Sequence, residues 1–162
     1  MKKLVLIFLV LLNGCVSLHS PYPEGYDGPS ALFASTENRI DGSTVQLFYL
    51  EKVNQKLIVN SMGASRGVTQ GQGFSFTSQL IESAVPAIQS TFTIVGATAN
   101  AAPIQSLFSD NLIVRGDITF KPEPHTEYIV KGTLNPEYLA VWIENKETGE
   151  IISRKIEETP AK

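Results

Sequence analysis

Hydrophobic and polar residues alternate with a period of two along much of the chain. The alternation is clearest in four stretches, at residues 74–80, 88–94, 112–120 and 128–134. Successive side chains of a β-strand point to opposite faces of its sheet, so this period is typical of a strand with one buried face. The pattern therefore predicts four half-buried strands.

Three further segments contain enough hydrophobic residues to form strands, at 31–35, 44–50 and 139–143. The segment 44–50 is apolar on both faces, which predicts a central strand that is covered on both sides. The dipeptides Asp41-Gly42 and Asn54-Gln55 suit tight turns before and after it.

Two segments depart from the strand pattern. Residues 61–73 contain several glycines and almost no large hydrophobic residue, which predicts a mobile loop. Pro103 suits the first position of a helix, and the hydrophobic residues within 104–108 have helical spacing. This second segment predicts one or two turns of helix.

Together these elements predict an all-β domain over residues 30–162. We expect an antiparallel β-sandwich of about seven to nine short strands with at most one short helix. The last hairpin is expected to turn at 145–149 and to return along 151–152 before a charged tail. A length of 162 residues with 43% hydrophobic residues fits one packed domain.

A basic and then hydrophobic segment opens the chain. Lys2 and Lys3 precede an uninterrupted apolar run from Leu4 to Leu12. This is the pattern of an export signal, and the run is too short to span a bilayer, which needs about twenty residues. We therefore expect residues 1–14 to be a cleaved leader and not a membrane-spanning helix.

The end of this leader resembles the lipobox of bacterial lipoproteins. Leu12, Gly14 and Cys15 occupy matching positions, whereas Asn13 is larger than the usual residue. Fatty acyl chains such as palmitate hold lipoproteins in a membrane, so the resemblance implies lipid attachment at Cys15. Cys15 is the single cysteine, which excludes an intrachain disulfide. The alternative is an ordinary secretory leader with an incidental cysteine.

The residues after Cys15 bear on where the domain would lie. Val16 stands where lipoproteins retained in the inner membrane commonly have Asp, so we expect the outer membrane and its periplasmic face. Residues 15–29 are rich in Pro and Gly, which predicts a tether that reaches about 45 to 50 Å when fully extended.

Charge excludes one class of partner. The chain has a net charge of -3, and loss of Lys2 and Lys3 with the leader moves it to about -5. Nucleic-acid binding depends on positive charge that neutralises phosphates. We therefore expect no nucleic-acid partner.

Four segments of the mature chain are similar to those of small, uncharacterised proteobacterial lipoproteins. They are Tyr26-Asp27-Gly28-Pro29, 85–96, 116–132 and 141–149. The resemblance covers most of the mature chain and implies a single β-sandwich domain. It implies no catalytic residues, because the shared residues are turn residues and core aromatics.

The candidate catalytic and metal-binding residues form no complete site pattern in the sequence. His19 falls in the tether and His125 in a turn, and neither has a second ligand at the spacing of a metal site. The Gly-x-Ser-x-Gly spacing at residues 63–67 is not expected to form a nucleophile elbow, and carboxylate pairs such as Glu123 and Glu127 are expected to be solvated. Trp142 is expected to pack in the core, with stacking on a sugar or peptide as the alternative. We expect a protein that is not an enzyme and binds neither metal nor cofactor.

Two functions are compatible with this reading of the sequence. The first is an envelope lipoprotein that binds another envelope protein or has a structural role, for example by accepting a strand at an exposed sheet edge. The second is a periplasmic binding module for a small or polymeric ligand, with loops 61–73 and 99–110 as adjacent lips.

In the second function, Ser65, Arg66 and Gly67 are the candidate ligand-binding residues. A glycine-rich loop that carries an arginine can hold an anion. A nucleotide-binding P-loop is excluded, because the segment lacks the required Lys followed by Ser or Thr.

Overall fold

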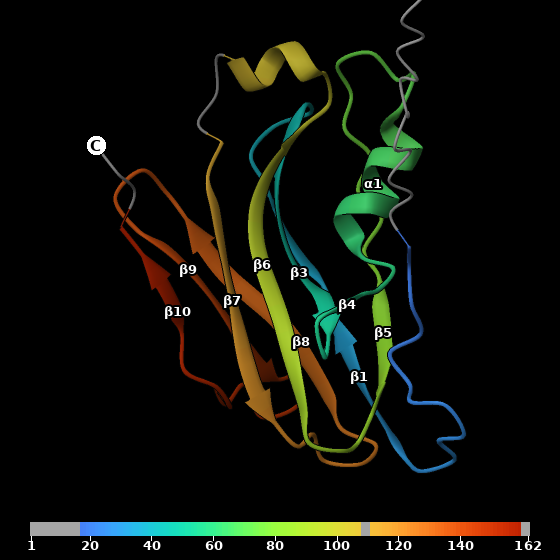
Figure 1. The fold of residues 1–162 in the computed structure, drawn as a ribbon. Coiled ribbons are helices and arrows are strands. Elements are labelled where there is room, and N and C mark those ends of the chain that lie inside the picture. Colours follow the sequence, from blue (N-terminus) through green and yellow to red (C-terminus); the bar gives the residue numbers. More distant parts are fainter. Residues whose placement is uncertain (1–16, 108–110, 160–162) are drawn as a thin grey trace, which may run out of the picture.

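The computed structural model describes residues 17–107 and 111–159, which form two packed β-sheets of five strands each (Figure 1). The first sheet has the order β10-β9-β8-β1-β5, with β1 (Ser30–Ala34), β5 (Glu82–Pro86), β8 (Glu127–Leu134), β9 (Leu139–Asn145) and β10 (Ile156–Glu158). The second sheet has the order β2-β3-β6-β7, with β2 (Thr36–Arg39), β3 (Thr44–Val53), β4 (Lys56–Leu57) beside β3, β6 (Ser90–Asn100) and β7 (Ile113–Phe120). The predicted all-β sandwich is confirmed.

The chain passes from the first sheet to the second at Ser35. Before this residue β1 pairs with β5 antiparallel and with β8 parallel, and after it β2 pairs with β3 antiparallel. The amide and the hydroxyl of Ser35 both donate to the carbonyl oxygen of Ile81, at 3.1 and 3.0 Å. One continuous stretch of chain therefore ties the two sheets together.

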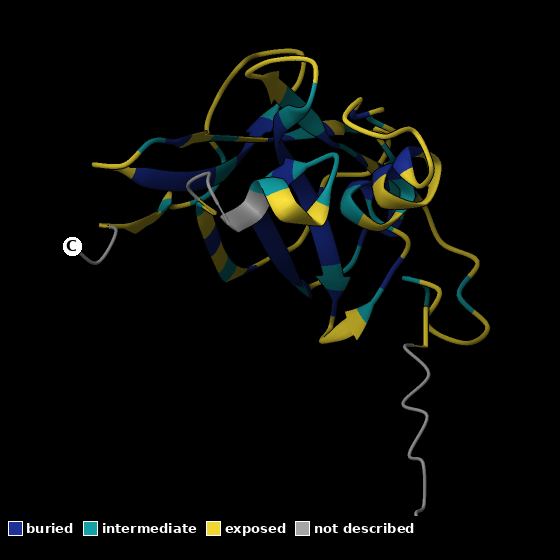
Figure 2. Ribbon diagram, turned by 90° about the horizontal axis from the view of Figure 1, so that it is seen from above, coloured by how far each residue is buried: buried dark blue, intermediate teal, exposed yellow. Residues whose placement is uncertain are grey.

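The main core lies between the sheets, where the strands are buried (Figure 2). Four aromatic rings meet at one place in it. Phe33 stacks on Phe92 with ring centroids 4.9 Å apart, and Phe120 and Tyr128 pack around this pair. These rings come from both sheets, so their burial holds the sheets together.

A second, smaller core lies on the outer face of the second sheet. Phe48 and Leu50 of β3 face the main core, whereas Leu47 and Tyr49 belong to the second cluster together with Phe76. The helix α1 (Ser61–Thr69) covers this face (Figure 1). The prediction that residues 44–50 form a strand covered on both sides is confirmed.

Several other predicted elements agree with the structure. The segments 112–120 and 128–134 correspond to β7 and β8, and both show alternating burial. Most of the segment 88–94 falls in β6, which begins at Ser90. The turn at Asn54-Gln55 has φ angles of 50° and 64°, as a tight reversal with a left-handed backbone requires.

Three predicted elements are wrong. The glycine-rich segment 61–73 is not a loop, because its first nine residues form α1. The segment 74–80 is extended but belongs to no sheet, so its alternation does not mark a strand. The final hairpin returns only through an isolated bridge from Glu144 to Ile151, and the charged tail supplies the strand β10 instead.

The N-terminal segment lies on the domain and not away from it. The amide of His19 donates to the carbonyl oxygen of Leu57 at 2.8 Å, and the hydroxyls of Tyr22 and Ser30 are 2.8 Å apart. These two hydrogen bonds therefore join the predicted tether to the domain at His19 and Tyr22. Cys15 and the predicted leader are outside the described residues.

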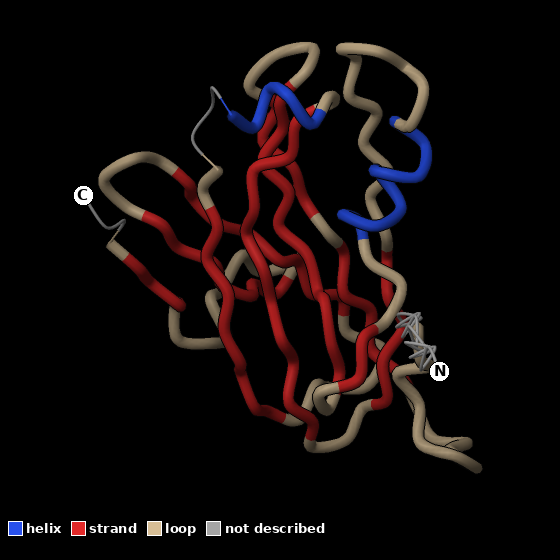
Figure 3. The backbone as a smooth tube through the Cα atoms, turned by 45° about the horizontal axis from the view of Figure 1, so that its top comes forward, coloured by secondary structure: helices blue, strands red, loops and turns tan. Residues whose placement is uncertain are grey.

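Among the described residues, no helix is both long enough and apolar enough to cross a membrane. The second helical segment, η1 (Pro103–Leu107), is a single short 3-10 helix, which agrees with the one or two turns predicted there. Figure 3 shows η1 and α1 towards the same end of the sandwich, where β6 ends.

Candidate functional site

A cavity of about 660 Å³ opens between the end of α1 and the end of β6. One wall consists of residues within 66–76, and the other consists of residues 98–103 together with Asn111. Small-molecule sites in proteins have volumes of about 300 to 1,000 Å³, so this cavity has the size of such a site. It is the candidate functional site of the chain.

The first wall begins in α1, a helix of low intrinsic propensity because it contains two glycines. Asn60 caps its N-terminus by accepting a hydrogen bond from the amide of Gly63 at 3.0 Å. Contacts with the extended segment 76–81 then hold the helix in place. The helix therefore depends on tertiary contacts more than on its own sequence.

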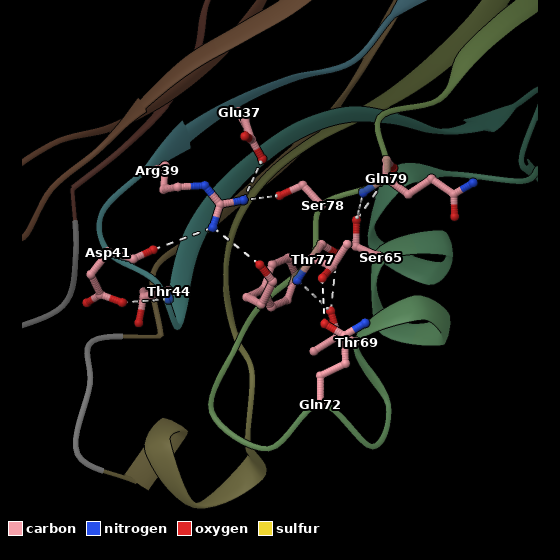
Figure 4. Close-up of polar contacts among 11 residues, drawn as sticks. Glu37, Arg39, Asp41, Thr44, Ser65, Thr69, Gln72, Thr77, Ser78 and Gln79 are labelled. Atoms are coloured by element: carbon pink, nitrogen blue, oxygen red, sulfur yellow. Dashed lines mark hydrogen bonds and ion pairs between the residues drawn. The ribbon is translucent and has the colours of Figure 1, made fainter.

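Three hydroxyl side chains on one face of α1 bind the backbone of this extended segment, and Figure 4 shows two of them, Ser65 and Thr69. Ser61 accepts from the amide of Ile81 at 2.8 Å. Ser65 accepts from the amide of Gln79 at 2.8 Å and donates to its carbonyl oxygen at 3.4 Å. The hydroxyl of Thr69 accepts from the amide of Thr77 at 3.0 Å and donates to its carbonyl oxygen at 3.1 Å. All three hydroxyl residues are buried.

The spacing of these contacts follows from helix and strand geometry. Four residues of an α-helix rise about 6 Å, and two residues of an extended chain rise about 6.6 Å. Ser61, Ser65 and Thr69 are four residues apart, so each meets every second residue of the antiparallel segment. The three side chains replace the neighbouring strand that the segment lacks, which satisfies its backbone groups.

Arg39 holds the same segment from the other side (Figure 4). Its guanidinium donates to the carbonyl oxygen of Phe76 at 3.3 Å and to the hydroxyl of Ser78 at 2.9 Å. The carboxylate of Glu37 is 3.6 Å from this guanidinium. The segment that carries Phe76 into the cavity wall is thus fixed between β2 and α1.

The turn between β2 and β3 supports both walls. The carbonyl oxygen of Gly42 accepts from the amide of Phe76 at 2.9 Å, and that of Ser43 accepts from the amide of Ala101 at 2.8 Å. Asp41 stabilises the turn by accepting from the amides of Ser43 and Thr44 at 2.7 and 2.8 Å. The hydrogen bonds from Ser43, followed by those from Thr44, hold the pKa of the Asp41 carboxyl below its usual value.

The chemistry of the lining suits binding. Phe76 and Ala99 are buried in the second core and supply apolar surface, whereas Gln70 and Asn111 supply amide groups. Arg66 is the one charged residue among the lining residues that the structure describes. The hydroxyl of Thr69 is already bonded to Thr77, and the described lining residues include no His, Cys, Lys, Asp or Glu that could act as a base for a hydroxyl nucleophile.

The structure brings together the two segments that the sequence proposed as lips. Parts of 61–73 and of 99–110 both line the cavity. Phe76, Thr98 and Asn111 also line it but lie outside the two predicted lips, and the alternation around Phe76 predicted only a strand. No signal in the sequence indicates that the backbone of segment 74–80 binds a helix.

The candidate residues Ser65, Arg66 and Gly67 have different surroundings. All three lie inside α1, so the predicted loop is wrong, whereas ligand binding by these residues stays a prediction. The Ser65 hydroxyl is occupied by Gln79, and a side-chain atom at Gly67 would meet open space. Arg66 is exposed and is the member of this set that lines the cavity.

The remaining candidate residues lie elsewhere. Among residues 17–107 and 111–159, no three His, Cys, Asp or Glu side chains are grouped as a metal site requires. His125 lies in a turn with a φ of 61°, beside a polar hollow that is also lined by Glu123 and Glu127. His19 lines a different hollow next to β5.

Trp142 does not pack in the core, which corrects the expectation from the sequence. It lies half-buried on the outer face of the first sheet. Its indole nitrogen donates to the Glu144 carboxylate at 2.7 Å, and the Lys155 ammonium lies 4.4 Å from the ring centroid. The ring is thus covered by a cation rather than left open for stacking.

Comparison with known proteins gives no match: no family model, no curated protein and no solved structure is significantly similar to this chain.

Proposed function

We propose that this protein is a lipid-anchored envelope protein whose β-sandwich is a non-catalytic binding module for a small ligand. The cavity between the end of α1 and the end of β6 supports the binding part of this proposal. Its two walls are about thirty residues apart in the sequence, and backbone hydrogen bonds to the turn at Gly42 and Ser43 hold both of them. A cavity that is formed before the ligand arrives loses little conformational entropy on binding.

The anchoring part of the proposal rests on the lipobox. Attachment of lipid at Cys15 would place the domain at the outer membrane, on the periplasmic face. His19 is hydrogen-bonded to Leu57, and four extended residues from Cys15 reach about 13 to 14 Å. The domain would therefore lie directly at the membrane surface and not at the end of a long tether.

Thermal unfolding in the presence of envelope glycans, lipids and metabolites tests the binding module. A ligand at one hundred times its dissociation constant adds about 2.7 kcal/mol to the stability of the folded state. We expect at least one compound to raise the melting temperature of the wild type. Ala102→Trp fills the cavity and should remove this shift, whereas Ala84→Trp beside β5 should keep it.

Mass spectrometry of the membrane fraction tests the anchor. We expect a peptide that starts at Cys15 and carries acyl mass, and we expect Cys15→Ala to lose both this mass and its membrane association. An unmodified N-terminus beyond residue 15 on a soluble protein would refute the anchor and leave the binding module as a separate question.

A second candidate function is recognition of an envelope protein through the β7 edge. In the described part of the chain β7 pairs with β6 on one side and with no strand on the other, so its backbone can accept a partner strand. Crosslinking in intact envelopes from a residue on this edge, such as Ile113, tests it. Ile113 is 49% exposed. Recovery of the same crosslinked partner from residues on the opposite face would argue against the β7 edge.

A further inference from the structure

We infer that the cavity between the end of α1 and the end of β6 binds a small organic anion. In this ligand a carboxylate or phosphate group is attached to an apolar body about the size of a ring system. This inference rests on the proposed binding function and names the class of ligand. Arg66 would bind the anionic group, and the apolar body would lie against Phe76 and the alanines of the opposite wall.

The charge of the cavity lining points to an anion. Among the described residues that line the cavity, Arg66 is the one charged residue, and none of the others is Asp or Glu. The chain as a whole has a net charge of -3, so this local excess of positive charge is opposite to the overall balance. The positive charge of Arg66 attracts an anionic ligand and repels a cationic one, so an anion is favoured at this site.

Arg66 is also available to bind. The guanidinium groups of Arg39 and Arg115 form ion pairs with Glu37 and Glu51, whereas no carboxylate in the described ranges pairs with Arg66. The side chain lies on the exposed surface of α1. A guanidinium that is not already neutralised can form two parallel hydrogen bonds to a carboxylate or phosphate.

The helix that carries Arg66 is fixed relative to the opposite wall. The neighbouring residue Ser65 is fully buried and binds both backbone groups of Gln79. Arg66 lies one position further along the helix, which turns its side chain away from segment 76–81. A charged group on a fixed backbone loses less entropy when it binds than one on a mobile loop.

The opposite wall favours an apolar body of limited size. Residues 99, 101 and 102 are alanines, and Phe76, which is 4% exposed, lines the same cavity. Amide side chains such as Gln70 lie among the lining residues and can bind further oxygen atoms of the ligand. Apolar surface with a few polar groups is the usual composition of a small-molecule site.

Three probes with one ring system test the inference on the mature chain in lipid nanodiscs. The probes are 1-naphthoate, 1-naphthyl phosphate and the uncharged 1-naphthamide, and ligand-observed NMR titration gives their affinities, with empty nanodiscs as the blank. We expect at least one anion to bind about tenfold more tightly than the amide, because a hydrogen bond between charged groups is stronger than one to a neutral amide. The better of the two anions shows whether the natural ligand is a carboxylate or a phosphate.

Two matched substitutions test whether Arg66 causes the preference for anions. Arg66→Gln should abolish the preference for the anion while leaving the affinity for 1-naphthamide unchanged. Arg154→Gln removes an exposed arginine that does not line the cavity, and it should retain the preference. An unchanged preference in Arg66→Gln would overturn the inference.

The cavity-filling variant separates this inference from the proposed function. If Ala102→Trp weakens all three probes but the anions bind no better than the amide, the cavity binds ligands and the assignment to anions is wrong. If no probe binds the wild type, or if Ala102→Trp changes nothing, the binding function fails and the inference fails with it.

Discussion

The hydroxyl of Ser65 binds both backbone groups of Gln79, accepting from the amide at 2.8 Å and donating to the carbonyl oxygen at 3.4 Å. With the corresponding contacts of Ser61 and Thr69, it joins α1 to the extended segment 76–81. One wall of the cavity therefore depends on three hydroxyl groups of a helix that lacks strong helix-forming residues.

Ser65→Ala should destabilise the protein by about 1 to 2 kcal/mol, because the amide and carbonyl groups of Gln79 lose a buried partner. Urea unfolding at pH 7 measures the change in the free energy of unfolding. Ser75→Ala is the control, because Ser75 is exposed and should change stability by less than about 0.5 kcal/mol. Equal effects of the two substitutions would contradict the role of Ser65.

Gly132→Ala should destabilise the protein by about 1 to 3 kcal/mol or more. A Cβ atom at this position would collide with the carbonyl oxygen of Ala140 and with the ring of Phe48 from the opposite sheet. Neither backbone nor a buried ring can move freely in a packed core.

Gly67→Ala is the matched control for this substitution and should act in the opposite direction. A Cβ atom at Gly67 meets open space on α1, and alanine favours a helix over glycine by about 0.5 to 1 kcal/mol. Chemical unfolding of the two variants gives both values. Destabilisation by Gly67→Ala would contradict the helical structure of residues 61–69.

Stability should fall in acid partly because of Glu144. Burial raises the pKa of this carboxyl, but hydrogen bonds from Trp142 at 2.7 Å and Lys131 at 2.9 Å outweigh it and leave the pKa below its usual value of 4.5. The folded protein therefore binds the proton less well than the unfolded chain. The stabilising contribution is present above about pH 4.5 and is lost as the pH falls through the lower pKa of the folded state.

Urea unfolding midpoints of wild type and Glu144→Gln, measured between pH 7 and pH 3, test this contribution. The variant should be less stable than wild type at pH 7, and the difference should shrink as the pH falls. A difference that is independent of pH would show that ionisation of Glu144 does not contribute.

Tyr49 should keep its proton at unusually high pH. Burial, followed by the charge of the Glu51 carboxylate, raises the pKa of Tyr49 to about 12. The unfolded chain loses this proton near pH 10, so the associated stability is present below pH 10 and is lost as the pH rises towards 12.

Absorbance at 295 nm follows the ionisation of tyrosines during a titration with base. Tyr49→Phe should remove the step near pH 12 that precedes or accompanies unfolding. Tyr22→Phe should leave that step in place, because Tyr22 lies in the N-terminal segment and not under α1. The persistence of the step in Tyr49→Phe would assign it to another group.

The sequence identified most of the sandwich because local patterns carry the relevant information. Alternation in 112–120 and 128–134 reports one buried face, and β7 and β8 form there. The same rule failed at 74–80, where Phe76 is buried in the second core but Phe74 and Leu80 are exposed. The backbone of this segment binds side chains of α1 instead of a neighbouring strand, and a period of two does not report which partner the backbone has.

Part of the candidate site could also be predicted from the sequence. The two segments without strand character were proposed as adjacent lips, and both line the cavity. The helical state of residues 61–69 was not accessible, since glycines and serines favour loops in isolation. Its stabilising partners are residues 77–81, which lie beyond the window in which local propensity acts.

The sequence by itself determined the all-β class, most strand positions and the turn at Asn54-Gln55, because alternation and turn chemistry depend on near neighbours. The tertiary structure alone decided that a glycine-containing segment becomes α1 and that Arg66 lies beside the alanines at the end of β6. These outcomes depend on hydrogen bonds and packing between distant residues. The free energy of such contacts exceeds the local preferences that a sequence pattern reports.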